Sequence, residues 1–332
     1  MKKSASLVGL VVALPVSFAA AADLPSRKEP AIAPIVVPSW TGFHVGLNAG
    51  GTWGAGGAAN MSTWTAVLAN SGRTAADQRL NYTDALYDWA LPSALGVTNS
   101  LSPNSSGFIV GGQIGYDWQA TFGGRSFVTG VEADIQGVAS TGNTATGLRV
   151  TAVGNQHTTS AGAPIATVTS VSKNLDYLGT VRGRVGYLAT PEIMIYGTGG
   201  LAYGGARISS STMSYAPTIS PSSDLTYAWG SAGSSSNTQV GWTAGGGAER
   251  MFLPNWSLKG EYLYYDLGKV TYNQGLSGAY VTANSRLAGD YYAGQLWWGN
   301  MSQVSTRFNG NIVRLGVNYH FNFATVPVVA KF

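Results

Sequence analysis

Histidine is scarce in this chain, and only His44, His157 and His320 are available for acid–base chemistry or metal ligation. His157 lies in a stretch rich in Ser, Thr, Gly and Ala, where we expect a solvated side chain. His44 and His320 belong to the first and last regularly patterned segments, which become neighbours if the sheet closes. Imidazole pairs ligate haem iron and metals, although most such sites need further ligands. We therefore expect two ordinary polar residues of the interior, with a haem or metal site as the alternative for this pair, and no cofactor is predicted.

Charged residues of both signs lie on the same face of their segments as these two histidines. If that face encloses a narrow interior, opposite charges must pair there, because an unpaired buried charge costs several kcal/mol. We predict a network that plugs the interior, since a charged channel lining needs more width than eight strands provide. Its members are Asp117, Glu132, Asp134, Arg182, Arg184, Glu249, Lys259, Glu261 and Arg314.

Other catalytic arrangements find little support in the sequence. Cysteine is absent, which excludes disulfides, thiolate metal sites and catalytic cysteines. The glycine pairs at Gly111, Gly199 and Gly245 lack the lysine and the strand-to-helix context of a phosphate-binding loop. A membrane-embedded lipid hydrolase needs a nucleophile, a base and an orienting group within reach, but the two histidines would face away from lipid. We therefore predict that the protein is not an enzyme.

The elements that position these residues are eight segments in which apolar and polar residues alternate, the signal of a β-strand. In the first segment Phe43 and Val45 lie on one face and His44 on the other. The fourth places Leu175 on the apolar face and Asp176 on the polar face, whereas the Gly-rich fifth has ambiguous faces. The segments are 43–48, 107–118, 127–136, 175–187, 193–206, 239–249, 256–264 and 313–323.

The connections alternate between short and long. Tight turns are expected at 122–124, 190–191 and 253–255, with long stretches rich in Ser, Thr, Asn, Gly and Ala between the other segments. A sheet in lipid must close on itself, because lipid offers its edges no hydrogen bonds. We predict an all-β fold, an eight-stranded antiparallel up-and-down transmembrane β-barrel with four long extracellular loops and short periplasmic turns.

Two further expectations follow from this barrel. Residues 148–153 and 165–171 are expected to extend its strands beyond the membrane. Aromatic residues at the ends of the segments are expected to form the girdles at the two membrane surfaces. These aromatic residues are Trp40, Trp118, Tyr187, Trp256 and Phe323.

The N-terminus carries the features of a secretory signal. Lys2 and Lys3 precede an apolar run and a stretch of alanines, with cleavage expected after Ala21 or Ala22. The rest of the sequence contains no run of about 18 apolar residues, so a membrane-spanning helix is not predicted. The net charge of +4 without a basic tract argues against nucleic-acid binding. The predicted parts are a signal peptide (1–22), a Pro-rich periplasmic linker (23–39), the barrel (40–323) and a C-terminal tail (324–332).

Several motifs together resemble one family. They include Ala22-Asp23-Leu24-Pro25, Ser39-Trp40-Thr41-Gly42-Phe43-His44-Val45-Gly46 and Leu178-Gly179-Thr180-Val181-Arg182-Gly183-Arg184. This set is similar to the outer-membrane surface-antigen barrels of alphaproteobacteria, also labelled porin-family or outer-membrane immunogenic proteins, of OmpA/OmpX-type architecture. The resemblance implies a structural surface protein, with haem binding in some members and no fixed catalytic set. The family usually has an aromatic residue at the position of His44, which implies a local difference in the interior.

These observations predict a non-enzymatic protein of the Gram-negative cell outer membrane, with a structural and surface-antigen role carried by its loops. A small porin-like diffusion channel is the alternative, and a haem-binding surface protein a weaker one. The expected partners are outer-membrane lipid and lipopolysaccharide, the barrel-insertion machinery during biogenesis, and host or environmental ligands at the loops. No nucleic-acid partner is expected.

Overall fold

The structure is a computed structural model, and it describes most of the predicted barrel. The described residues are 39–68, 90–103, 106–140, 144–152, 164–216, 228–280 and 296–321. The predicted signal peptide, nearly all of the linker, the C-terminal tail and His157 lie outside these ranges. The division of the chain into those parts therefore remains a prediction.

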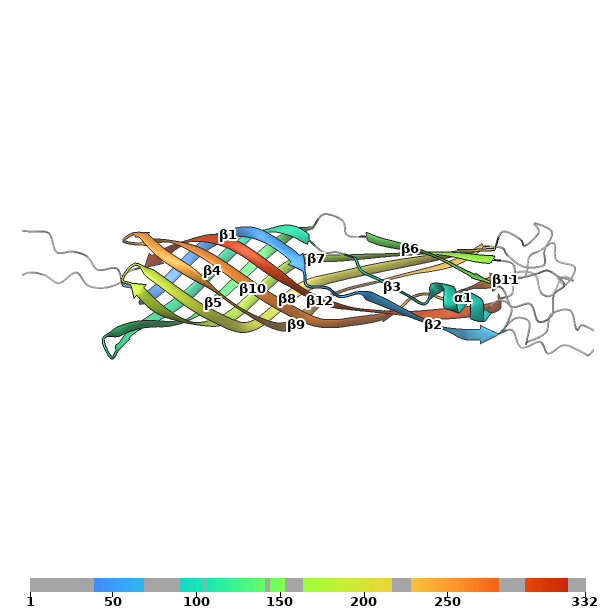
Figure 1. Cartoon of the computed structure of the whole chain (residues 1–332), viewed down its shortest axis with the longest axis horizontal. Helices are drawn as coiled ribbons and strands as arrows, with labels where there is room; N and C mark the ends of the chain where they lie inside the picture. The colour runs from blue at the N-terminus through green and yellow to red at the C-terminus, as the bar shows by residue number, and fades with distance from the viewer. Residues whose placement is uncertain are drawn as a thin grey trace, which may run out of the picture. The chain divides into compact units, whose positions relative to one another are not determined.

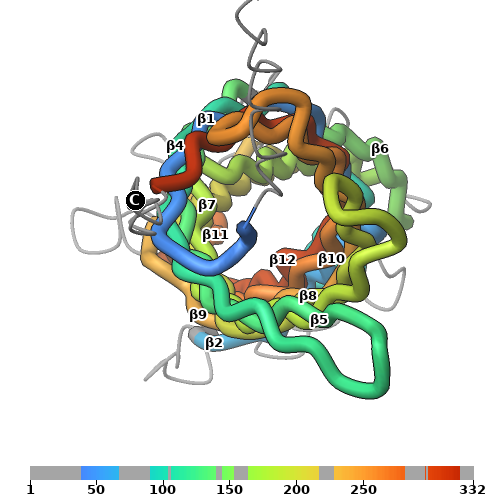
Figure 2. Tube along the Cα trace, turned by 90° about the vertical axis from the view of Figure 1, so that its left-hand side faces the viewer, coloured from blue at the N-terminus to red at the C-terminus, as the bar shows by residue number. Residues whose placement is uncertain are grey.

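Eight long antiparallel strands form a closed ring. Each pairs with its neighbours in the order β1-β4-β5-β7-β8-β9-β10-β12, and β12 pairs back with β1, so that His44 faces His320 across the seam. Figure 1 shows these strands, and Figure 2 shows the ring end-on. The predicted eight-stranded barrel is confirmed. The ring strands are β1 (Gly42–Gly54), β4 (Ser106–Phe122), β5 (Arg125–Ser140), β7 (Pro164–Thr190), β8 (Ile193–Tyr215), β9 (Ala228–Leu253), β10 (Trp256–Asn273) and β12 (Leu296–Phe321).

Three tight turns connect neighbouring ring strands at one end of the barrel, which we call the turn end. In the first, Phe122 pairs with Arg125, and Gly123 and Gly124 between them have φ values of +59° and +75°. Glycine adopts such values readily because it has no Cβ, and two of them in sequence suit a two-residue hairpin. The other turns lie between Thr190 and Ile193 and between Leu253 and Trp256. The opposite end is the loop end.

The two faces of the ring have the polarity of a membrane barrel. Large apolar side chains point outward and are exposed, among them Leu47 at 74% and Leu315 at 63%. A soluble protein rarely exposes so continuous an apolar surface. On β7 this surface runs from Tyr177 to Tyr187, close to the 9–11 residues that a tilted strand needs to cross a bilayer. We call this outer surface the apolar band.

One predicted face is wrong. Leu175 is only 6% exposed and points inward, whereas Asp176 is exposed. The register of β7 against β8 shifts between Leu175 and Leu178, the signature of a β-bulge. An extra residue in one strand shifts the alternation by one position. Side chains on the two sides of the bulge therefore follow opposite inward and outward patterns.

Several ring strands continue beyond the apolar band at the loop end. β7 has 27 residues, and β9 and β12 have 26 each, far more than a bilayer crossing requires. As predicted, residues 165–171 belong to a strand that runs past the band. Residues 148–152 lie in β6, which pairs with it, whereas Val153 is outside the described residues. We call this part the extension.

Shorter elements complete the extension. They are β2 (Ala59–Leu68), α1 (Leu91–Val97), β3 (Asn99–Leu101), β6 (Thr144–Ala152) and β11 (Ser277–Tyr280). Among the described residues, no helix has the length and apolar character needed to cross a membrane.

Trp40 departs from the expected girdle position. Trp118, Tyr187 and Trp256 are 42–51% exposed on the outside, as predicted, but Trp40 is fully buried at the turn end of the lumen. Its indole Nε1 donates a hydrogen bond to the carbonyl oxygen of Pro191 at 3.0 Å. Trp40 precedes the first strand, so the chain crosses the barrel mouth before it enters the wall. Phe323 lies outside the described residues.

Candidate functional site

The structure places all nine predicted charged residues in the lumen, and none is more than 5% exposed. Inward positions alternate with outward ones along each ring strand, so the side chains of six different strands converge on one space. We call this set the charge network. Its members come from β4 (Asp117), β5 (Glu132 and Asp134), β7 (Arg182 and Arg184), β9 (Glu249), β10 (Lys259 and Glu261) and β12 (Arg314).

Arg182 and Arg314 hold the part of the network farther from the turns. Arg314 donates from Nε and Nη2 to Glu261 Oε2 at 2.8 and 2.6 Å, and from Nη2 to Asp134 Oδ2 at 2.8 Å. Arg182 donates to Glu261 Oε1, Glu132 Oε1 and Asp134 Oδ2 at 2.9, 2.5 and 2.9 Å. Each carboxylate in this part therefore accepts from more than one cation, a charge-assisted arrangement that fixes every side chain.

Arg184 holds the part nearer the turns. It donates to both carboxylate oxygens of Asp117, at 2.8 Å from Nε and more closely from Nη2, and from Nη1 to Glu249 Oε2 at 2.9 Å. Glu132 joins the two parts, because its Oε2 lies 3.6 Å from Arg184 Nη1, and Lys259 Nζ lies 2.8 and 2.9 Å from its two oxygens. The predicted pairing of opposite charges is therefore present in the geometry.

The network carries an unequal number of charges. Its five carboxylates face four cations, so one negative charge remains unless a neighbouring group or a bound cation compensates it. The candidate compensating groups are the two histidines, which lie against the part nearer the turns.

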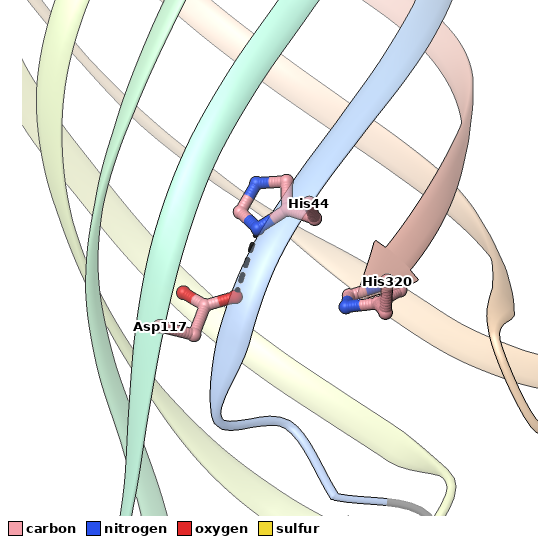
Figure 3. Close-up of side chains that lie close together, drawn as sticks. All are labelled: His44, Asp117 and His320. Atoms are coloured by element: carbon pink, nitrogen blue, oxygen red, sulfur yellow. Dashed lines mark ion pairs between the residues drawn. The ribbon is translucent and has the colours of Figure 1, made fainter. Parts of the chain in front are cut away.

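His44 and His320 approach each other as the closed ring predicts. Their Cα atoms are register partners across the seam, and their ring centroids are 5.5 Å apart. Nδ1 of His44 lies 3.2 Å from Asp117 Oδ2, and its Nε2 lies 3.4 Å from Glu132 Oε2. Figure 3 shows His44, Asp117 and His320 facing a common space inside the barrel. The structure thus adds two carboxylates to the histidine pair that the sequence predicted.

Two inward glycines make room for this group. A Cβ atom on Gly115 would lie 2.5 Å from the His44 ring, and one on Gly130 would lie 2.1 Å from Asp117 Oδ1. Both distances are far below a van der Waals contact, so no larger residue fits at either position while these side chains stay in place. Gly115 of β4 and Gly130 of β5 therefore leave the space that the side chains of His44 and Asp117 occupy.

Sequence reasoning missed three residues of the site. Tyr196 donates from its hydroxyl to Glu261 Oε1 at 3.0 Å, but it belongs to the segment whose faces were ambiguous. Ser257 donates to Glu249 Oε1 at 2.5 Å, and its alternate position on β10 gives the signal that could have identified it. Trp40 packs edge-on against His320 with centroids 5.6 Å apart, and its place before the first strand gave no such signal.

Apolar side chains fill the lumen on both sides of the network. At the turn end the cluster comprises Trp40, Val128, Leu188, Met194, Tyr196 and Met251. Toward the loop end, buried residues such as Ile109, Leu263 and Ile312 form a larger cluster. The sequence predicted a polar plug, whereas the described interior has a polar layer between two apolar ones.

Lys173 is buried within the extension, above this larger cluster. It is 1% exposed, its Nζ donates to the carbonyl oxygen of Arg307 at 2.5 Å, and the ammonium lies 4.7 Å from the centre of the Phe308 ring. Burial lowers the pKa of Lys173 from its ordinary value to about 8.

The hydroxyl, imidazole and carboxylate of Ser257, His320 and Glu249 do not form a catalytic relay. Ser257 Oγ lies 2.9 Å and Glu249 Oε1 lies 3.3 Å from the same nitrogen, Nε2 of His320. In a working triad the carboxylate binds the nitrogen opposite the one that activates the hydroxyl. The geometry favours a structural or ligand-binding role for this histidine.

Comparison with known proteins gives a consistent result. The family model described as the outer membrane protein β-barrel domain matches residues 10–321. Two curated relatives, each a 31 kDa outer-membrane immunogenic protein, come from Brucella melitensis biotype 1 and Brucella suis biovar 1. Each is 32% identical over 265 residues, which cover 79% of this chain and 87% of the relative. Among solved structures, the outer membrane protein OprG of Pseudomonas aeruginosa matches with a TM-score of 0.36 and 10% identity, over 86% of this chain and 98% of its own.

Proposed function

Because the chain belongs to the outer-membrane β-barrel domain family and is a protein of the outer membrane, we propose that it is a non-enzymatic anchor that presents its extension at the cell surface. The observation that carries this proposal is the contrast between a lumen packed with side chains and strands that continue past the membrane. The barrel holds the protein in the bilayer, and the extension and loops meet external ligands.

The packed lumen favours an anchor over the alternative of a diffusion channel. An eight-stranded barrel has an interior just wide enough for side chains. Here the interior contains the charge network, with apolar clusters on either side, and Ile109, Leu263 and Ile312 are all fully buried. A water-filled path would have to displace ion pairs and apolar contacts in succession.

The extension favours a surface role. Apolar side chains stand exposed on its outer strand β6, with Leu148 at 69% and Val150 at 60%. The Brucella relatives are named immunogenic, which agrees with exposure of such a region to the outside. The proposed partners are outer-membrane lipid and lipopolysaccharide around the apolar band, the insertion machinery during assembly, and host or environmental ligands at the loops. Nucleic acid is not among them.

Cysteine labelling in intact cells tests the surface exposure. The chain has no cysteine, so Leu148→Cys in β6 and Glu192→Cys in a turn each introduce one thiol. A membrane-impermeant maleimide should label Leu148→Cys in intact cells and Glu192→Cys only after the outer membrane is permeabilised. Labelling of Glu192→Cys alone in intact cells would contradict the proposed orientation.

Conductance in planar lipid bilayers separates the anchor from the channel. The refolded wild-type protein should give no steady openings. A general porin reconstituted in the same bilayers shows that the assay can detect an opening. Steady wild-type openings of appreciable size would favour the porin-like alternative.

A further inference from the structure

The lumen brings together side chains of the kinds that bind transition metals. The candidate ligand atoms of His44, Asp117 and His320 all lie within 4.8 Å of one another, and all three residues are buried. Two imidazoles and a carboxylate suit zinc and related divalent ions. We propose that these three residues form a site for a divalent transition-metal ion, with Zn²⁺ as the reference case, inside the barrel near its turn end.

The distances are close to those that a metal requires. Ligand atoms of a tetrahedral zinc site with bonds of about 2.0–2.1 Å are about 3.3 Å apart. The distance of 3.2 Å between His44 Nδ1 and Asp117 Oδ2 already has this value. His320 completes the set after an approach of up to about 1.5 Å, which rotation of its side chain can provide, because its ring faces the same space (Figure 3).

A second, independent observation concerns the hydrogen bonds of His44. Its side chain is fully buried, yet neither Nδ1 nor Nε2 has a hydrogen-bond partner of acceptable geometry. Buried polar atoms are nearly always satisfied, so such a pair needs an explanation. A metal on Nδ1 supplies one, and it leaves the N–H at Nε2 directed toward Glu132 Oε2, 3.4 Å away. Metal-bound histidines commonly donate their second N–H to a carboxylate in this way.

The charges permit a cation at this position. With both histidines neutral, the charge network has a net charge of −1, and a divalent ion changes it to +1, an imbalance of the same size. Asp117 would be shared between the metal and Arg184, which contacts both of its oxygens. Glu249 Oε1, which lies 3.3 Å from His320 Nε2, is a candidate for a further oxygen ligand of the metal.

The surroundings favour a single ion over a haem group. Charged and polar side chains border the pair on the network side, and Trp40 covers His320 from the turn end. A porphyrin needs wide apolar walls, whereas a single ion needs only the ligands. Because Trp40 and the larger apolar cluster close the lumen, we expect metal to enter during refolding more readily than afterwards.

Metal content after refolding with Zn²⁺ tests the site. Wild type, His44→Asn, His320→Asn and the control His157→Ala are refolded in detergent with Zn²⁺, freed of excess ion, and assayed by elemental analysis of the heat-modifiable, folded fraction. We expect one zinc per barrel in wild type and in His157→Ala. Each lumen variant should retain well under one zinc per barrel, because each removes a direct ligand.

Two outcomes would overturn the proposal: equal zinc in wild type and both lumen variants, or loss of zinc in His157→Ala alone. A measurement on the wild type is decisive even if the lumen variants fail to fold. Zinc-edge X-ray absorption should show two imidazole nitrogens with oxygen in a four- or five-coordinate shell. A six-coordinate shell of oxygen alone would refute the site, as would haemin that binds while zinc does not.

Discussion

Replacing Arg314 by methionine removes a guanidinium from the charge network but keeps a long, unbranched side chain. The change deletes the three hydrogen bonds that Arg314 donates to Glu261 and Asp134. Breaking a buried ion pair by removing one partner costs about 3–5 kcal/mol of the free energy of unfolding. Both carboxylates keep their bonds from Arg182, so we expect a loss near the lower limit, about 3 kcal/mol.

The double variant Arg314→Met/Glu261→Gln tests the cause of this loss. It removes the carboxylate that the single variant leaves underpaired and restores the original net charge. Because buried pairs replaced as a unit are much less destabilising than broken ones, the double variant should recover about 1–2 kcal/mol relative to Arg314→Met. The measurement is urea-induced unfolding in phospholipid vesicles, followed by tryptophan fluorescence and by heat-modifiable gel mobility.

Arg207→Met is the matched control. Arg207 pairs with Asp176 at 3.1 Å, but the two side chains are 57% and 43% exposed. Exposed pairs contribute about 0–1 kcal/mol. If Arg314→Met destabilises the protein no more than Arg207→Met does, the network does not stabilise the barrel and the reasoning is wrong.

Two further predictions concern the wall and the extension. Gly115→Ala should destabilise the barrel by about 1–3 kcal/mol, because its Cβ would lie 2.5 Å from the His44 ring. Gly112→Ala on the same strand, whose Cβ would meet no atom closer than 3.7 Å, should be tolerated in the same urea assay. The unfolding free energy should also rise with pH between about 8 and 10.5, because folded Lys173 releases its proton at a lower pH than the unfolded chain does. The free energy of unfolding should increase by about 3 kcal/mol over this pH range. Lys173→Met should abolish the dependence on pH. If the variant keeps the same dependence, groups other than Lys173 cause it.

The faces of the strands could be predicted wherever the two faces differ in polarity. Arg182 and Arg184 alternate with Val181 and Val185, so the period of two assigns each to its side. The same period, together with closure of the ring, predicted the approach of His44 and His320.

Prediction failed where alternation is absent or interrupted. Phe108, Ile109 and Val110 are consecutive apolar residues, so polarity alone does not distinguish the buried Ile109 from its exposed neighbours. The apolar layers around the network therefore had no polarity signal, and only the phase of the alternation farther along each strand places their residues inward. The bulge beside Leu175 shifts the alternation of inward and outward side chains by one residue, and the residue types around it do not reveal this change of backbone geometry. Trp40 lies before the first strand, so periodicity does not apply to it.

The seam between β1 and β12 joins the first and last strands of the ring, which almost the whole barrel sequence separates. Each newly exported chain must therefore travel with two unpaired strand edges until synthesis and translocation are complete, and such edges are templates for aggregation. Pairings this distant in sequence also form slowly. The topology itself therefore requires that these two edges stay protected until β1 has joined β12.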